Sequence, residues 1–98
     1  MSDETQVTVR DVPEESVFVI EVDGRRAGRV DYRIDGDRMV FTHTEVSEEF
    51  SGRGLAGKLA KHALDDAVER GLVIVPRCPF IAAYAKRHEE YEGFLEEA

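Results

Sequence analysis

The hydrophobic pattern of this chain changes its period at a glycine-rich segment, and that change constrains the fold more than any other feature. Before the segment, apolar and polar residues alternate, as in half-buried strands. After it, Leu55, Leu59, Ala63 and Ala67 repeat every four residues, which is typical of a helix with one buried face. The sequence therefore predicts a sheet in the first half and helices with a further strand in the second half.

Two short turns divide the first half into neighbouring strands. Asp23-Gly24 is a two-residue hairpin signal, and Asp35-Gly36-Asp37 marks a second tight turn. Tight turns join antiparallel neighbours, so an antiparallel meander is expected. The predicted strands are 5–10, 16–22, 29–34 and 38–46. In the last of them, strict alternation puts four side chains on one face: Met39, Phe41, His43 and Glu45.

The second half predicts a helix, a strand and another helix. The first helix begins near Leu55 and ends at Arg70-Gly71, where glycine suits the position after the helix. The apolar run 72–75 is a buried strand that Pro76 stops. Pro79 opens a second helix that ends at Gly93. The order is β-β-β-β-α-β-α, an α/β (α+β) fold in which strand 72–75 lies parallel to the fourth strand.

The glycine-rich segment also predicts an anion site. Gly52, Gly54 and Gly57 precede or open the first helix, and a helix start offers unpaired N–H groups and a positive dipole end. Segment 50–64 holds no acid, and its bases are Arg53, Lys58 and Lys61. Residues 50–88 hold 7 basic and 3 acidic residues, net +4, in a chain of net charge −8. A phosphate or pyrophosphate group is the expected ligand.

Composition excludes several classes of protein. A chain of 98 residues with 42% hydrophobic residues is expected to form one domain, 1–98, and a monomer or weak dimer. Its net charge of −8 argues against nucleic-acid binding. No apolar run reaches the roughly 20 residues of a membrane span, and the polar start is no signal peptide. The single Cys78 forms no internal disulfide, so a cytoplasmic protein is expected.

Four residues are candidates for catalysis. Cys78 directly precedes the second predicted helix, where the helix dipole and Arg77 favour a thiolate; the alternative is a small buried hydrophobic residue. His43 or Glu45 is a candidate general base, or His43 is held by structural hydrogen bonds. Tyr84 is a candidate proton donor or a core residue. No histidine or cysteine shows the spacing of metal ligands, so no metal is expected.

Three segments resemble the GNAT superfamily of acetyl-CoA-dependent acyltransferases, and in particular its minimal single-domain branch of about a hundred residues. They are His43-Thr44-Glu45-Val46, Phe50 to Ala56, and Pro76 to Ile81, followed by Tyr84, His88 and Tyr91. The Cys-Pro-Phe-Ile sequence within the third segment is specific to the small branch. The resemblance covers the chain from the second strand to the last helix.

The resemblance implies a site for acetyl-CoA. In the pyrophosphate motif of the superfamily, Gly54 and Ala56 fill two fixed places, whereas Ser51 stands where glutamine or arginine is usual. The end of the fourth strand is expected to bind the pantetheine arm, beside a splay between this strand and strand 72–75. Tyr84 falls near the position that protonates the leaving thiolate in many relatives. The expected binding residues are Thr44, Val46, Ser51, Gly52, Arg53, Gly54, Leu55, Ala56, Gly57 and Lys58.

These expectations leave two main functions open. The first is an N-acetyltransferase that transfers acetyl from acetyl-CoA to an unidentified small amine or peptide, with Cys78 as a covalent acyl carrier in one variant. The second is a binding module that senses CoA or acyl-CoA without catalysis. The unusual Ser51 and the missing acceptor-binding parts of larger relatives favour the second. A domain that keeps the fold and has lost the ligand ranks third.

Overall fold

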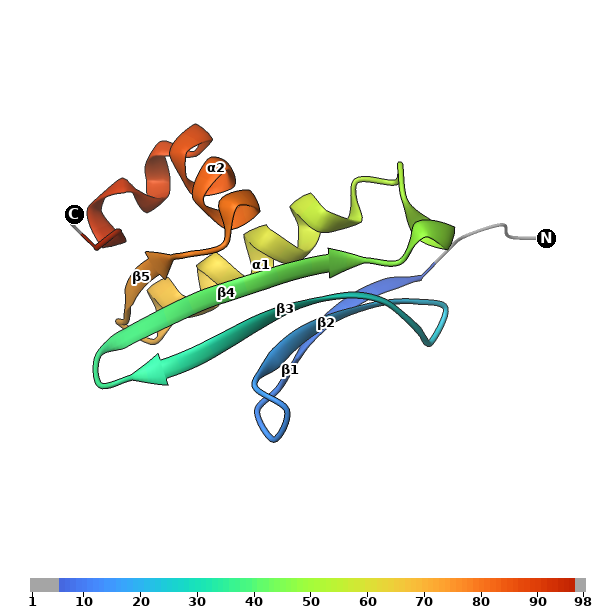
Figure 1. Cartoon of the computed structure of the whole chain (residues 1–98), viewed down its shortest axis with the longest axis horizontal. Helices are drawn as coiled ribbons and strands as arrows, with labels where there is room; N and C mark the ends of the chain where they lie inside the picture. Colours follow the sequence, from blue (N-terminus) through green and yellow to red (C-terminus); the bar gives the residue numbers. More distant parts are fainter. Residues whose placement is uncertain (1–5, 97–98) are drawn as a thin grey trace.

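The computed structural model describes residues 6–96, in which two α-helices pack on a five-stranded sheet (Figure 1). The element order confirms the predicted β-β-β-β-α-β-α sequence and the mixed α/β class. The predicted first strand begins at Thr5, which lies outside the described residues. The elements are β1 Val7–Val12, β2 Val17–Val22, β3 Arg25–Asp35, β4 Arg38–Val46, α1 Leu55–Glu69, β5 Val73–Pro76 and α2 Pro79–Arg87, with 3-10 helices at Glu48–Phe50 and Glu89–Phe94.

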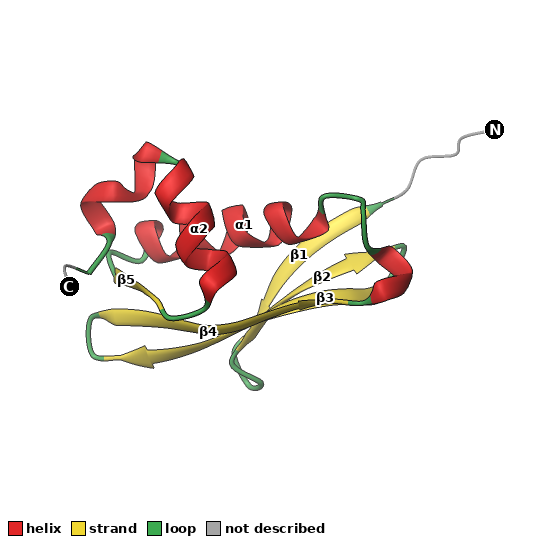
Figure 2. Ribbon diagram, turned by 45° about the horizontal axis from the view of Figure 1, so that its top comes forward, coloured by secondary structure: helices red, strands yellow, loops and turns green. Residues whose placement is uncertain are grey.

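The strands lie in the order β1-β2-β3-β4-β5. The first four are antiparallel neighbours, and β5 runs parallel to β4, as predicted. The β4–β5 pairing extends only from Arg38↔Val73 to Phe41↔Pro76, because Pro76 has no N–H with which to continue it. Beyond Phe41, β4 continues while the chain after β5 turns into α2 (Figure 2). The two parallel strands therefore diverge halfway along β4.

A β-bulge reverses the faces of the second half of β4. Between Phe41 and His43 the register against β3 shifts by one residue, which leaves Thr42 as an extra residue. Met39 and Phe41 are buried under the helices, whereas His43 and Glu45 are exposed on the other face. The prediction that these four side chains share one face was wrong, since a single extra residue moves every later side chain to the opposite face.

The second helix is shorter than predicted. It ends at Arg87 rather than at Gly93, and a 3-10 helix follows. His88 between them has φ −120° and ψ 100°, which is extended backbone. Its ring nitrogen Nδ1 lies 2.7 Å from the Tyr84 carbonyl oxygen, which is the acceptor that the next helical turn would use. The side chain of His88 thus replaces a backbone hydrogen bond and ends the helix.

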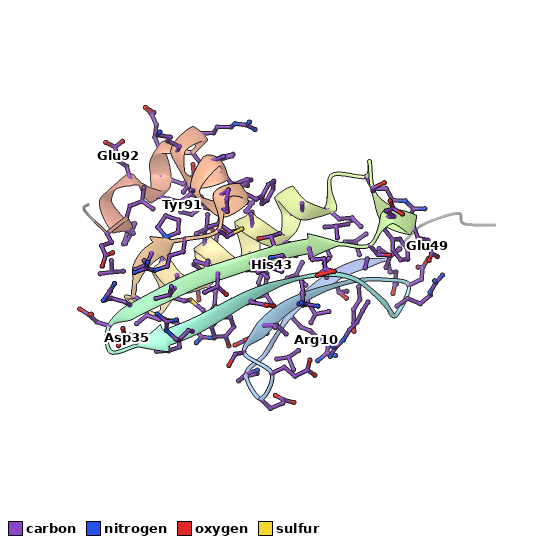
Figure 3. All side chains as sticks on the ribbon, viewed as in Figure 1. Arg10, Asp35, His43, Glu49, Tyr91 and Glu92 are labelled. Carbon is purple, nitrogen blue, oxygen red and sulfur yellow. The ribbon has the colours of Figure 1, made fainter. Side chains whose placement is uncertain are left out.

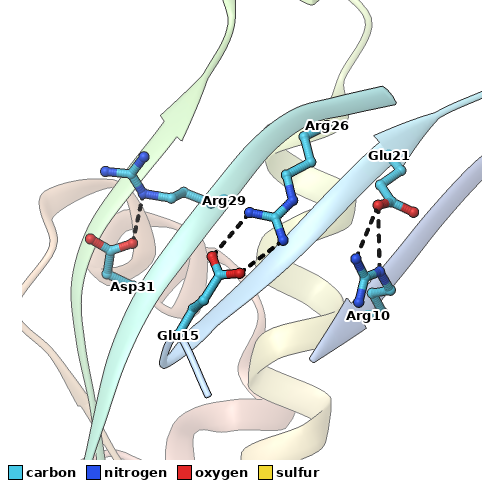
Figure 4. A network of polar contacts seen from close by, with 6 residues as sticks. All are labelled: Arg10, Glu15, Glu21, Arg26, Arg29 and Asp31. Atoms are coloured by element: carbon cyan, nitrogen blue, oxygen red, sulfur yellow. Dashed lines mark hydrogen bonds and ion pairs between the residues drawn. The ribbon is translucent and has the colours of Figure 1, made fainter. Parts of the chain in front are cut away.

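The two faces of the sheet are covered differently. Both helices lie on one face, where the main core includes Phe18, Phe41, Leu59, Leu64, Ile74 and Ile81. Among residues 6–96 no helix covers the other face, where Val12, Val17 and Val19 form a small cluster. Side-chain ion pairs lie on this face: Arg10–Glu21 joins β1 to β2, Arg26–Glu15 joins β3 to the β1–β2 turn, and Arg29–Asp31 lies within β3 (Figure 4). None of the described helices is long and apolar enough to cross a bilayer.

Candidate active site

The glycine-rich turn places unpaired N–H groups at the start of α1. Gly52 and Gly54 have φ of 81° and 72°, a left-handed conformation that other residues rarely adopt. Apart from the adjacent residues, no atom would lie within 4 Å of a Cβ at either position, so backbone conformation rather than crowding requires glycine. Gly54 is the N-cap and provides no side chain, and the first turn of α1 has no acid. The helix start can therefore receive an anion.

The free edge of β4 leads from this turn toward the splay. The N–H of Ser47 donates to the Ala27 carbonyl of β3, 2.8 Å away. Successive strand residues direct their backbone groups to alternate sides, so the groups of Val46 and Thr44 point away from β3. β5 pairs with β4 only as far as Phe41, and these groups therefore lie on an open edge. Such an edge can bind an extended ligand that carries amide groups, as pantetheine does.

Cys78 lies where β4 and β5 diverge, immediately before α2. Its N–H and that of Arg77 both donate to the Phe41 carbonyl, at 2.9 and 3.0 Å. Its side chain is 4% exposed, and Sγ lies 3.2 Å from Oγ1 of Thr44. The structure thus brings together two of the predicted site residues, one from each side of the splay.

Tyr84 projects from α2 toward the first turns of α1. A ring carbon of Tyr84 lies 3.9 Å from the position that a Cβ on Gly57 would take. The ring stacks on His88 with centroids 4.0 Å apart. Burial raises the pKa of Tyr84, and the nearby Lys61 ammonium only partly opposes this. The phenol is therefore protonated at neutral pH and can donate a proton.

His43 and Glu45 lie apart from Cys78 and Tyr84. Both are more than half exposed on the face without helices, and His43 Nε2 is 3.4 Å from Glu45 Oε1. Glu45 also lies 3.4 Å from Arg29. A cavity of about 280 Å³ adjoins this face, and its lining residues are Arg26, Ala27, Gly28, Arg29, Glu45 and Ser47.

One residue that the sequence did not point to, Arg25, lies beside the glycine-rich turn. The guanidinium carbons of Arg25 and Arg53 are 5.3 and 5.4 Å from the ring centroid of Phe50. Arg53 was a predicted binding residue, and Phe50 begins the acid-free segment 50–64. Arg25 is the first residue of β3, directly after the β2–β3 turn. The Asp23-Gly24 signal located the hairpin correctly, yet no pattern in the sequence shows which loop a hairpin will approach.

The remaining predicted binding residues lie in or next to the same turn. Ser51, Arg53 and Lys58 are exposed, whereas Leu55 is buried in the core and contributes its backbone alone. Ala56 is half-buried in the first turn of α1. No group of three or more His, Cys, Asp or Glu side chains suited to a metal ion occurs among residues 6–96.

Comparisons with known proteins agree with this architecture. Protein NATD1 from Gallus gallus and from Homo sapiens are each 43% identical over 58 residues, which is 58% of this chain and 53% and 51% of theirs. The chain thus spans about half the length of the curated relatives it matches. The solution structure of a GCN5-like putative N-acetyltransferase from Staphylococcus aureus has a TM-score of 0.70 at 25% identity and covers 93% of this chain and 89% of that one.

Two more distant structures share the fold. Ribosomal-protein-alanine N-acetyltransferase from Brucella melitensis has a TM-score of 0.56 at 23% identity, covering 84% of this chain and 62% of that one. N-acetylglutamate synthase from Neisseria gonorrhoeae, solved with coenzyme A and N-acetyl-glutamate, has a TM-score of 0.54 at 18% identity, covering 69% and 18%. The family model described as GCN5-related N-acetyl-transferase matches residues 17–94, a span that contains the glycine-rich turn, the open edge of β4 and α2. The chain therefore belongs to the GCN5-related N-acetyltransferase family.

Proposed function

We propose that this protein transfers the acetyl group of acetyl-CoA to an amine. The observation that carries the proposal is the continuity of two binding features, the uncapped start of α1 and the open edge of β4. The first suits the pyrophosphate and the second the pantetheine arm, and the edge ends beside Cys78 at the splay. Membership of an N-acetyltransferase family supports the same reaction.

The residues of this chain divide the binding between backbone and side chains. N–H groups of the turn and of the first turn of α1 contact the pyrophosphate, with Lys58 adding positive charge. Backbone groups of Thr44 and Val46 bind the amides of pantetheine. Ser51 offers only a short hydroxyl in place of the usual longer side chain, so this anchor is weaker than in most of the superfamily.

The transfer itself needs a proton donor, a base and an oxyanion donor. The amine nitrogen attacks the thioester carbonyl carbon, a C–N bond forms, and the C–S bond then breaks. An open N–H of β4 stabilises the oxyanion. The phenol of Tyr84 gives its proton to the leaving thiolate. His43 or Glu45, on the face without helices, takes the proton lost by an amine that approaches from that face.

The binding part of the proposal is tested by titrating ¹⁵N-labelled protein with acetyl-CoA. We expect amide shifts to concentrate in residues 44–57 and at the start of α2, with those of β1 unchanged as an internal control. If the amides of residues 44–57 do not move at millimolar acetyl-CoA, the proposed site is wrong.

The catalytic part is tested by measuring CoA release with a panel of amines and peptides. Tyr84→Phe keeps the ring against Gly57 but removes the proton donor, so kcat should fall by about a hundredfold with little change in acetyl-CoA affinity. His43→Gln and Glu45→Gln, measured across pH, decide which of the two acts as base. Unchanged kcat in Tyr84→Phe would exclude its role.

The covalent variant gives Cys78 a different part. Its sulfur would attack the thioester, its proton would pass to the CoA sulfur, and the acetyl-cysteine would then react with the amine. Measuring the intact mass of the protein during turnover separates the covalent route from direct attack by the amine. The covalent route adds one acetyl group to the wild type and none to Cys78→Ala, whereas direct attack adds none to either.

A non-catalytic CoA-binding module is the second candidate, favoured by Ser51, and it predicts binding without acceptor-dependent CoA release.

A further inference from the structure

We infer that Arg25 and Arg53 form a recognition point for the 3′-phosphate of CoA. The inference rests on the proposed function, because it concerns the same bound nucleotide. It goes beyond that function by naming the residues that distinguish CoA from its 3′-dephospho form. Three observations carry it: a shared aromatic anchor, the charge around the two guanidinium groups, and their place beside the glycine-rich turn.

Phe50 anchors both arginines. It is 6% exposed and ends the 3-10 helix Glu48–Phe50, so its ring is fixed in the core. Arg53 reaches it from the turn between Gly52 and Gly54, and Arg25 reaches it from the β2–β3 hairpin. Guanidinium groups are attracted to an aromatic face, which restricts their motion. Two segments far apart in the sequence thus present positive charge around one ring.

The local charge suits a phosphate. Arg25 pairs with Glu49 at 2.7 Å, but the two side chains are 65% and 57% exposed, and such pairs are weak and exchange readily. Within residues 6–96 no carboxylate lies within salt-bridge distance of Arg53. A phosphate monoester carries about −1.5 to −2 charges near pH 7, so it outcompetes one carboxylate for a guanidinium. Arginine also matches phosphate with two parallel hydrogen bonds.

The pyrophosphate does not account for this pair. Its proposed partners are backbone N–H groups at the start of α1, which need no side chain. CoA carries one further phosphate, the 3′-monoester on the ribose next to the pyrophosphate. In Figure 3, Glu49 and Asp35 lie at opposite ends of the molecule. Arg25, which pairs with Glu49, and Arg53, which contacts the same Phe50 ring, lie at the Glu49 end, beside the glycine-rich turn. A protein of net charge −8 otherwise repels so anionic a ligand, and two local cations offset that repulsion.

The test compares CoA with 3′-dephospho-CoA by calorimetry at about 0.1 M salt, where screening is moderate. The proteins are the wild type, Arg25→Gln, Arg53→Gln and the double variant. Arg33→Gln removes the same charge from exposed β3, near the opposite end of that strand, and serves as the matched control. We expect the wild type to bind CoA about tenfold more tightly than 3′-dephospho-CoA. This ratio corresponds to the contribution of about one charge-assisted hydrogen bond.

Each substitution at Arg25 or Arg53 should reduce that ratio, and the double variant should bring it close to one, whereas Arg33→Gln keeps it. A wild-type ratio of one overturns the inference and leaves the proposed function standing. So does an equal loss of affinity for both nucleotides in Arg53→Gln, which would assign Arg53 to the pyrophosphate. If neither nucleotide binds the wild type, the proposed function fails, and the inference fails with it. Unchanged melting curves confirm that the variants fold.

Discussion

Gly54 is the N-cap of α1 and Gly57 lies in its first turn, and only at Gly54 does the backbone conformation require glycine. Gly54 has φ 72°, so a side chain there is strained, and Gly54→Ala should lower the free energy of unfolding by about 1–2 kcal/mol. Gly57 is helical, and a Cβ would meet only a Tyr84 ring carbon at 3.9 Å. Gly57→Ala should therefore raise the free energy of unfolding by about 0.5–1 kcal/mol. Urea unfolding of both variants measures the difference.

Packing gives no reason for a glycine at position 57, whereas a ligand that passes close to α1 does. Gly57→Ala should consequently bind acetyl-CoA more weakly than the wild type even though it is more stable. A more stable variant with unchanged affinity would show that the ligand does not approach this turn. Loss of stability would show instead that Tyr84 cannot accommodate the added methyl group.

The Asp65 carboxylate makes the free energy of unfolding depend on pH in the acid range. Burial alone would raise its pKa, but hydrogen bonds from Tyr91, at 2.6 Å, and from Lys61 bring it below the ordinary 3.8. A lowered pKa in the folded state stabilises the protein above the unfolded pKa, and this contribution is lost as pH falls through the folded value. Tyr91→Phe should therefore cost about 1 kcal/mol at pH 7 and less below about pH 4.

Thermal unfolding of Tyr91→Phe and the wild type between pH 3 and pH 7 tests this. Tyr84→Phe serves as the control, because it removes a hydroxyl from the neighbouring helix α2 that makes no hydrogen bond to Asp65. A difference in melting temperature that stays constant over the whole range would mean that the Tyr91 hydroxyl does not act through the Asp65 carboxylate.

The bulge in β4 decides which side chains face the candidate site. Thr44 and Val46 lie on the helix side because Thr42 is an extra residue. Deleting Thr42 should remove the bulge but leave Phe41 opposite Tyr32 and His43 opposite Asp31, so that regular alternation keeps Thr44 on the helix side beside Cys78. We therefore expect the deletion variant to bind acetyl-CoA much as the wild type does in the same NMR titration. Thr42→Ala, which keeps the extra residue, should also bind normally. Loss of binding by a folded deletion variant would show that the site needs the bend at the bulge as well as the correct faces of the side chains.

Sequence patterns predicted the elements better than the places where elements meet. Strand β4, helix α1 and the parallel β5 follow from local periodicity and from turn glycines, and the structure confirms them. The bulge at Thr42 is a matter of pairing with β3, so no alternation within β4 reveals it. The approach of Arg25 to Phe50 and the hydrogen bond of His88 that ends α2 likewise depend on contacts that exist only in the folded chain.

Within the described residues, both helices and the main core lie on the same face of the sheet. The helices cover this face, and exposed ion pairs, each worth about 0–1 kcal/mol, lie on the other. The main core therefore lies between the sheet and the helices, and α1 and α2, which carry the candidate site, pack against it. Because the start of α1 and the edge of β4 belong to this one packed unit, a ligand that joins them stabilises the whole fold rather than a local segment.

Acetyl-CoA should therefore raise the melting temperature of the entire protein. At a hundredfold excess over Kd a ligand adds about 2.7 kcal/mol to the free energy of unfolding. For a domain of this size that corresponds to a shift on the order of 10 °C, which differential scanning calorimetry measures directly. Tyr84→Phe should show the full shift while losing turnover, because it keeps the binding surface and lacks only the proton donor. An unchanged melting temperature at millimolar acetyl-CoA would contradict the site, whereas a full shift without turnover in the wild type would favour the binding module.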